Sequence, residues 1–281
     1  MTTSSITNQI VRAAAVGLLA LATPTAPAAV SADASSAPIA APAKDAPAAT
    51  STDSELATQL IGAWILVGKP DHVGKAPSSG GRIKFFTGDH WCMTQSDPKT
   101  GVVLFNHGGA YTLDGDTYHE SVDYAGASTI EHVGNKGNYT IKIEGDTLTD
   151  IGIGNPWQEV WKRLKPADSK SLPANLTGTW AYAGEPGQTN IPALDTHRLK
   201  FCAGGYWCDL DIDPKTSVVT VHHGGSCVLK GDKYVETCQY ANPTTMPLIG
   251  EDVKFDLQSA DDTFTLTGLN NPWKEIWKKL D

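Results

Sequence analysis

Residues 111–120 read Tyr-Thr-Leu-Asp-Gly-Asp-Thr-Tyr-His-Glu, and residues 227–236 read Cys-Val-Leu-Lys-Gly-Asp-Lys-Tyr-Val-Glu. In the first stretch, Asp114-Gly115 stands between two runs of β-forming residues, which is the sequence signal of a tight β-hairpin. The second stretch repeats the arrangement at an offset of 116 residues. Together they predict a duplicated chain made of antiparallel strands.

The duplication extends well beyond this hairpin. Residues 60–165 align with residues 176–281 without a gap, and 40 of the 106 aligned positions are identical. A period of this length is too long for a solenoid repeat, so each copy is expected to fold as its own domain. We place the two domains at residues 56–165 and 172–281.

Each copy is predicted to be all-β, because no helical periodicity persists for three turns and turn residues separate short β-rich runs. About eight antiparallel strands follow one another in hairpins, and such a meander closes into an up-and-down barrel. The runs on either side of Gly108-Gly109 are either two strands or one strand bent by a bulge. In copy one we expect strands near residues 62–68, 81–87, 90–96, 102–108, 109–114, 116–124, 138–144, 146–152 and 157–164.

The order of the motifs resembles the lipocalin and calycin barrels, and more closely small bacterial lipocalin-like domains of unknown function. Each copy has Gly-x-Trp on its first strand, the hairpin ending in Tyr-x-Glu, and Glu-x-Trp on its last strand. The resemblance implies two tandem lipocalin-like barrels, each able to hold a ligand. It also implies that the first-strand Trp closes the barrel beneath a basic residue of the last strand. The residues concerned are Trp64 with Arg163 and Trp180 with Lys279.

The N-terminal part of the chain has a different composition. Residues 1–32 combine Arg12, an apolar run and small residues, and are predicted to be a bacterial-type signal peptide. Residues 33–54 are rich in Ala, Pro and Ser without an aromatic residue, and are predicted to be a disordered linker. The apolar run is too short to span a bilayer, so no transmembrane segment is expected. The protein is therefore predicted to be exported, either periplasmic or secreted.

The charge balance excludes one class of partner. The chain has 22 Lys and Arg residues against 31 Asp and Glu residues, a net charge of −9. Binding to nucleic acid needs a basic face, so no nucleic-acid partner is expected. Apolar residues make up 40% of the chain, which is enough to bury a core in each copy.

The turn at residues 97–102 sets an expected register for the strands that flank it. In copy one this register brings Cys92 opposite His107. The face of the strands that carries these residues is clearly apolar in copy two, so we expect it to line the barrel interior. The equivalent residues of copy two are Cys208 and His223.

The Asp114-Gly115 turn places an acid among the inward-facing residues. Tyr118, Glu120 and Tyr124 fall on one face of their strand, while the opposite face is polar. A buried carboxylate must be hydrogen-bonded or neutralised, so Glu120 is expected to bond a Tyr, His or Arg side chain, for a structural role or for a ligand. The candidate ligand-binding residues are Cys92, His107, Tyr111, Tyr118, Glu120 and Tyr124 in copy one and Cys208, His223, Tyr234, Glu236 and Tyr240 in copy two.

The cysteines suggest three other kinds of site, none of which we favour. A Cys–His–Glu set has the composition of a nucleophile with its base, but no oxyanion-hole motif accompanies it, so no catalytic residue is assigned. Cys208, His223 and Cys238 fall in one row, yet their spacing matches no zinc motif, so no metal or other cofactor is expected. No disulfide among the copy-two cysteines fits the expected register, so free buried thiols are predicted at Cys202, Cys208, Cys227 and Cys238.

These observations predict an exported, non-catalytic protein that binds a small, partly apolar ligand inside one or both barrels. The expected partner is a small hydrophobic or amphipathic molecule. The alternative is an interaction or structural module of the cell envelope whose barrels are filled by side chains. A third, less favoured reading is an enzyme that uses the interior Glu and His. A cavity distinguishes the first two, because a ligand of this kind needs several hundred cubic ångströms.

Overall fold

The computed structural model describes residues 51–72, 81–165, 174–188 and 195–280. The predicted signal peptide and most of the predicted linker lie outside these ranges. In the described part of the chain, no helix is long and apolar enough to cross a membrane.

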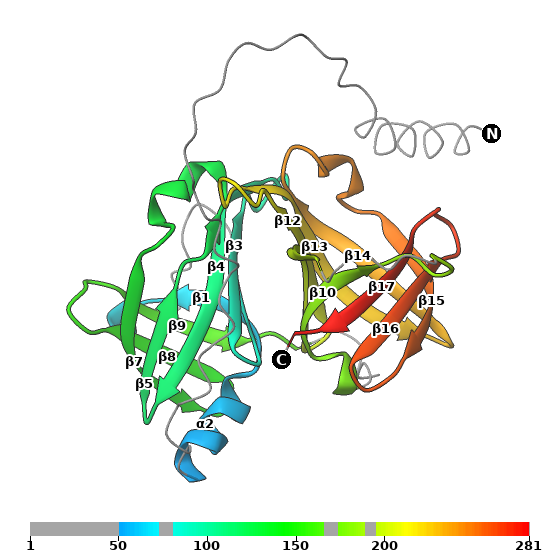
Figure 1. Cartoon of the computed structure of the whole chain (residues 1–281). Helices are drawn as coiled ribbons and strands as arrows, with labels where there is room; N and C mark the ends of the chain where they lie inside the picture. Colours follow the sequence, from blue (N-terminus) through cyan, green and yellow to red (C-terminus); the bar gives the residue numbers. More distant parts are fainter. Residues whose placement is uncertain (1–50, 73–80, 166–173, 189–194, 281) are drawn as a thin grey trace, which may run out of the picture. The chain divides into compact units, whose positions relative to one another are not determined.

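Copy one forms a closed antiparallel barrel (Figure 1). The last strand pairs with the first, and β3 pairs with β4, so that eight strands complete the wall. A two-residue strand, β6 (Tyr124–Ala125), pairs with β4 beyond the end of β5. The eight strands are β1 (Gly62–Gly68), β2 (Arg82–Thr87), β3 (His90–Ser96), β4 (Val103–Asp114), β5 (Thr117–Ser121), β7 (Lys136–Glu144), β8 (Thr147–Gly152) and β9 (Gln158–Arg163).

Copy two forms a second closed barrel of eight consecutive strands. The prediction of two tandem up-and-down antiparallel barrels is confirmed, and the runs flanking the Gly pair form one long strand in each copy. The strands are β10 (Gly178–Gly184), β11 (Asp195–Ala203), β12 (Tyr206–Ile212), β13 (Val219–Lys230), β14 (Lys233–Ala241), β15 (Asp252–Ser259), β16 (Thr263–Gly268) and β17 (Lys274–Lys279).

One end of each barrel is closed by the segment that precedes its first strand. Helix α2 (Ser51–Leu60) begins four residues inside the predicted linker, because Leu56 and Leu60, one turn apart, pack onto the barrel core. The indole of Trp64 donates a hydrogen bond to the carbonyl oxygen of Leu60 at 2.9 Å. The Arg163 guanidinium lies 4.1 Å from the centre of the Trp64 ring.

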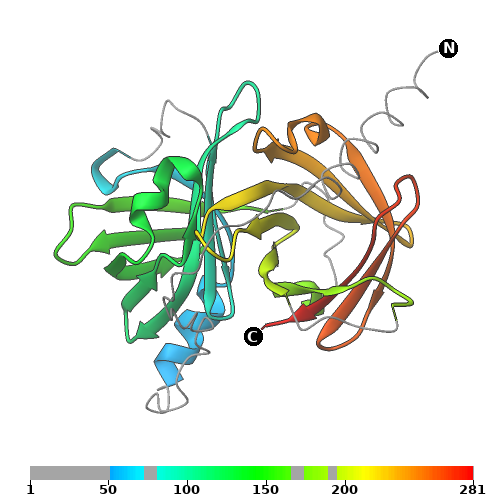
Figure 2. The ribbon, with the colours of Figure 1, turned by 45° about the horizontal axis from the view of Figure 1, so that its top comes forward.

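The closed end of the second barrel repeats these contacts. Trp180 donates to the Leu176 carbonyl oxygen at 3.0 Å, at the end of η3 (Ala174–Leu176), and the Lys279 ammonium lies 5.8 Å from the Trp180 ring. In barrel 1, α2 lies at one end and η2 (Ala127–His132) at the other (Figures 1 and 2). In each barrel, the end opposite the closed end is called the open end below.

The predicted register holds at the 97–102 turn, where Ser96 pairs with Val103, but it is wrong by one residue further along the two strands. A β-bulge after Gln95 leaves Leu104 unpaired, so Cys92 lies opposite Gly108 and Met93 lies opposite His107. A single-residue shift moves every following side chain to the other face of the strand. In copy two the same shift pairs Cys208 with Gly224 and Asp209 with His223.

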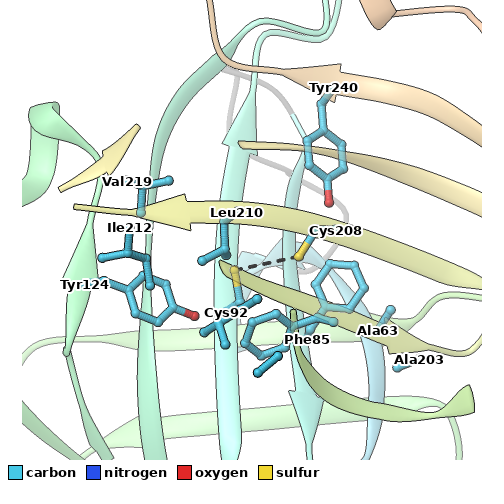
Figure 3. Packing of buried hydrophobic residues seen from close by; sticks show 13 residues of the cluster. Ala63, Phe85, Cys92, Tyr124, Ala203, Cys208, Leu210, Ile212, Val219 and Tyr240 are labelled. Atoms are coloured by element: carbon cyan, nitrogen blue, oxygen red, sulfur yellow. Dashed lines mark hydrogen bonds between the residues drawn. The ribbon is translucent and has the colours of Figure 1, made fainter. Parts of the chain in front are cut away.

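The apolar face that we expected inside each barrel therefore lies outside it. Two buried clusters fill the barrel interiors, around Trp64 and Trp161 in one and around Trp180 and Trp277 in the other. A third cluster combines residues of both copies and packs one barrel wall against the other (Figure 3). Its members include Ala63, Phe85, Cys92, Tyr124, Ala181, Phe201, Cys208, Leu210, Ile212, Val219 and Tyr240.

The contacts between the two walls come in equivalent pairs. Val102 forms a bridge with Ala241, and Ala125 forms a bridge with Val218. Val218 is the copy-two equivalent of Val102, and Ala241 is the copy-two equivalent of Ala125. Each bridge therefore joins the same two positions, and the two copies present the same surface to each other. Such a self-complementary contact is the geometry of a two-fold interface.

One polar contact in this interface supports a stability prediction. The Thr94 hydroxyl lies 2.6 Å from Nε2 of the fully buried His222. Thr94→Val leaves this ring without that partner and should lower the free energy of unfolding by about 1–3 kcal/mol. Urea titration of the full chain measures the change, and Thr112→Val on an exposed strand position is the control.

The duplication provides the rescue variant for this prediction. Leu210 and Asn106 occupy the positions equivalent to Thr94 and His222. The double variant Thr94→Leu/His222→Asn copies that pair and should recover most of the lost stability. Equal stability of Thr94→Val and the wild type would contradict a contribution from this hydrogen bond.

Candidate functional site

A lysine lies at the centre of barrel 1. The Lys84 ammonium is 2.9 Å from Glu120 Oε2, and only 5% of the Lys84 side chain is exposed. Tyr118 and Tyr139 donate hydrogen bonds to the same carboxylate, at 2.8 and 3.2 Å. Glu120 thus points into the barrel and bonds tyrosines, as expected, but its charged partner is a lysine that the sequence reasoning did not name.

Aromatic rings surround this ammonium group. It lies 4.6 Å from the centre of the Trp91 ring and 5.0 Å from those of Phe86 and Tyr118. Burial opposes the charge on Lys84, but the neighbouring carboxylates, Glu120 first, raise its pKa above the ordinary value. The amine therefore stays protonated, and a protonated amine is not a nucleophile.

Barrel 2 contains the same arrangement. The Lys200 ammonium is 2.9 Å from Glu236 Oε1 and 3.2 Å from Asp209 Oδ2, with 1% of its side chain exposed. Its ammonium lies 4.6 Å from the Trp207 ring. Burial raises the pKa of Glu236 to about 7, and the positive charge of Lys200 only partly opposes this shift.

Each barrel holds an additional acid, at a different position in the two copies. In barrel 1 it is Asp150, whose equivalent in copy two is Leu266. In barrel 2 it is Asp209, whose equivalent in copy one is Met93. Burial, followed by the charge of Glu159, raises the pKa of Asp150 to about 8. The two interiors therefore keep the same acid content by different residues.

An arginine–glutamate pair lies toward the open end of each barrel. Arg82 Nη1 is 2.9 Å from Glu159 Oε1, and the equivalent Arg198 Nη2 is 3.0 Å from Glu275 Oε1. Their position follows from the register, because Trp64 pairs with Lys84 and Arg82 lies two residues further from the closed end. The Arg82 and Arg198 side chains are 18% and 34% exposed, so they are in contact with solvent, unlike the lysines below them.

A histidine ring lies near the lysine and the arginine in each interior. His107 contacts Trp91 edge-on at 5.5 Å between ring centres, and His223 contacts Trp207 in the same way at 5.4 Å. Burial lowers the pKa of His107 to about 4 and that of His223 to about 3, so both rings are neutral at pH 7. Within the described residues, Nδ1 of each ring is buried and has no hydrogen-bond partner.

The structure separates the candidate residues into two groups. The residues that share the barrel interiors are His107, Tyr111, Tyr118, Glu120, His223, Tyr234 and Glu236. The others belong to the cluster between the barrels, namely Cys92, Tyr124, Cys208 and Tyr240. Tyr124 and Tyr240 leave the inward face because the register shifts by one residue near the Gly pair, where Gln239 is unpaired in copy two.

The candidate metal ligands are not brought together. Cys208 lies in the cluster between the barrels, whereas His223 lies inside barrel 2. Cys238 donates its thiol to the Tyr240 carbonyl oxygen at 3.4 Å. In the described ranges, no group of three or more His, Cys, Asp or Glu side chains is arranged to hold a metal ion.

The interior cations were missed although the sequence carries a signal for them. Residues 82–85 read Arg-Ile-Lys-Phe, and residues 198–201 read Arg-Leu-Lys-Phe. Three of these four positions are identical in the two copies, within an otherwise apolar strand. A cation that is present at the equivalent position of both copies in such a strand indicates a buried charge that is paired with acidic side chains.

The two closed, eight-stranded antiparallel barrels are compatible with a lipocalin-like fold. Comparison of the chain with protein-family models, with curated proteins and with solved structures found no match. The interior side chains of the two barrels are therefore the features from which a function is inferred.

Proposed function

We propose that the protein is exported and binds a small, partly apolar ligand inside one or both of its lipocalin-like barrels, near the open end. The ligand would contact the aromatic wall formed by Trp91 in barrel 1 and by Trp207 in barrel 2. It would lie above the buried lysine and beside the histidine ring. The arginine–glutamate pair would form the rim of the site.

The observation that carries this proposal is the unpartnered histidine nitrogen that recurs in both barrels. Nδ1 of His107 and Nδ1 of His223 are buried beside a tryptophan, without a partner among the described residues. A buried polar atom left unpaired costs about 1–3 kcal/mol. A ligand hydroxyl or carbonyl group would remove this cost, and a neutral ring can donate to or accept from such a group.

One observation favours the alternative, a module with filled barrels. Lys84 and Lys200 occupy the aromatic centres of the barrels, and their ammonium groups are already paired with carboxylates. In that case the histidine rings serve packing alone. The two proposals differ in whether a solute enters above the lysines.

Uptake of a fluorescent probe tests the ligand proposal. The probe is 1-anilinonaphthalene-8-sulfonate, which is apolar with one charged group. We expect saturable binding to the full chain, with quenching of tryptophan fluorescence, and native mass spectrometry should detect a co-purified small molecule. His107→Phe/His223→Phe should weaken probe binding about tenfold, because removal of a useful hydrogen bond costs about 1.4 kcal/mol.

The matched control is His119→Gln, which changes a histidine that bonds Asn138 on the outer side of barrel 1. This variant should bind the probe like the wild type. Absence of both saturable uptake and a co-purified molecule would reject ligand binding in favour of filled barrels. Wild-type affinity in the His107→Phe/His223→Phe variant would reject the placement of the site.

A further inference from the structure

One cysteine position is shared by the two copies. Cys92 and Cys208 are equivalent, whereas Cys202, Cys227 and Cys238 align with Phe86, Tyr111 and Val122. Cys92 is the one cysteine of residues 60–165, so any disulfide that it forms within the chain must be with a cysteine of copy two. The disulfides considered from the sequence were all within copy two, so the pair Cys92 and Cys208 was not among them.

The structure brings these two thiols together. Their strands, β3 and β12, face each other between the barrels, and the two Sγ atoms are 3.9 Å apart (Figure 3). The two-fold relation between the walls explains the meeting, because a residue close to such an axis faces its own equivalent. Tyr124 and Tyr240 lie in the same cluster and donate to the carbonyl oxygens of Trp91 and Trp207, which hold the neighbouring backbone.

We propose that Cys92 and Cys208 are a modification site, at which a disulfide joins the two barrels when the chain folds with a small-molecule disulfide as oxidant. The thiolate of one cysteine attacks the oxidant RSSR, forms a mixed disulfide and releases one RS⁻. The second thiolate attacks the protein sulfur of that mixed disulfide and releases the other RS⁻. The protein loses two electrons and two protons, and RSSR is reduced to two RSH.

The bond requires only a local movement. A disulfide has an S–S distance of about 2.05 Å, so the sulfur atoms must approach by roughly 2 Å. Both residues are fully buried among apolar side chains, and burial raises the pKa of Cys208 well above its ordinary range. Oxidation is therefore a step of folding, before the walls close, and the finished bond is shielded from reductants.

The experiment refolds the full chain in a buffer of reduced and oxidised glutathione. The protein is then denatured with an alkylating reagent and weighed by intact mass. Of the five cysteines, we expect three to be alkylated after oxidative refolding and all five after reduction. The unfolding equilibrium constant of the oxidised chain should be about a thousandfold lower, because the bond closes a loop of over 100 residues.

Three variants identify the pair. Cys92→Ala and Cys208→Ala should each leave all four remaining thiols free and make stability independent of reductant. Cys238→Ala is the matched control, a buried cysteine outside the pair, and should leave two free thiols. Five alkylated cysteines in the oxidatively refolded wild type would overturn the proposal, and this measurement does not depend on how the variants fold. A cross-link that persists in Cys92→Ala would overturn it as well.

Discussion

Lys200→Met is expected to lower the free energy of unfolding by about 3–5 kcal/mol at pH 8, because it leaves buried acids without their cation. Lys200 is almost entirely buried and lies within 3.2 Å of both Asp209 and Glu236. Methionine fills a similar volume, so the loss reports the uncompensated charges rather than a cavity. Urea titration of the full chain measures the change.

The cost should shrink as the pH falls. The pKa of Glu236 is about 7 with Lys200 in place, and it can only rise when that positive charge is removed. At pH 5 the carboxyl group is protonated and needs no cation. A loss of stability that is the same at pH 5 and at pH 8 would contradict this account.

Two further variants separate charge from packing. The triple variant Lys200→Met/Asp209→Met/Glu236→Gln removes the two acids together with the cation. Its Asp209→Met change introduces the residue that copy one has at the equivalent position, Met93. The triple variant should recover most of the lost stability, because uncharged side chains of similar volume leave no uncompensated buried charge. Lys142→Met changes a lysine that is 71% exposed and should alter stability by less than about 0.5 kcal/mol.

Much of the architecture could be predicted from the sequence, because turn residues mark where strands end. The structure has β1 at 62–68 and β3 at 90–96, as expected, and most other strands begin or end within two residues of the expected bounds. The long strand β4 covers the two runs whose division was left open. Local turn chemistry determines these features, so no knowledge of tertiary packing was needed.

The side of the barrel wall that each residue faces was harder to predict. Strands β3 and β12 are buried on both faces, so their more apolar face did not identify the interior. It is the face that packs against the other barrel. The inward direction of Glu120 was predicted correctly. A tight turn at Asp114-Gly115 was expected to place Tyr111 opposite Tyr118, whereas Tyr111 pairs with Glu120, and a shift of two residues preserves the face.

The pairing of Cys92 with Cys208 could not be found from the register of one copy. It depends on which wall of one barrel packs against the other, and that is a property of the folded surface. The interior lysines were missed for another reason, since a lysine in a strand is ordinarily solvent-exposed. Only their retention at equivalent positions of the two copies separates them from surface lysines.

The second large effect is expected in the pH dependence, where stability should be greatest near pH 6.5. Two buried acids set the alkaline side. The folded-state pKa is about 8 for Asp150 and about 7 for Glu236, against ordinary values of 3.8 and 4.5. Because these pKa values are raised on folding, the associated stability is present at low pH and is lost as the pH rises through 7 and 8.

Three buried histidines set the acid side. The folded-state pKa is about 4 for His107 and about 3 for His222 and His223, against 6.5 in the unfolded chain. Because these pKa values are lowered on folding, the associated stability is present above pH 6.5 and is lost as the pH falls toward 4 and 3. Between pH 4.5 and 6.5 the three histidines outweigh the two acids by one proton. Stability should therefore fall by about 1.4 kcal/mol for each pH unit below 6.5.

Single variants test which residues cause the loss of stability above pH 6.5 and which cause the loss below it. Asp150→Asn and Glu236→Gln carry no titrating proton, so each should flatten the loss of stability between pH 6.5 and 8. His222→Asn, which introduces the residue of copy one, should make the loss below pH 6.5 less steep by about 1.4 kcal/mol per unit. His119→Gln, which changes a side chain on the outer side of β5, should leave the profile unchanged. Stability that rises steadily from pH 4.5 to 9 would show that Asp150 and Glu236 are ionised at neutral pH. The conclusion that burial raises their pKa values would then be wrong.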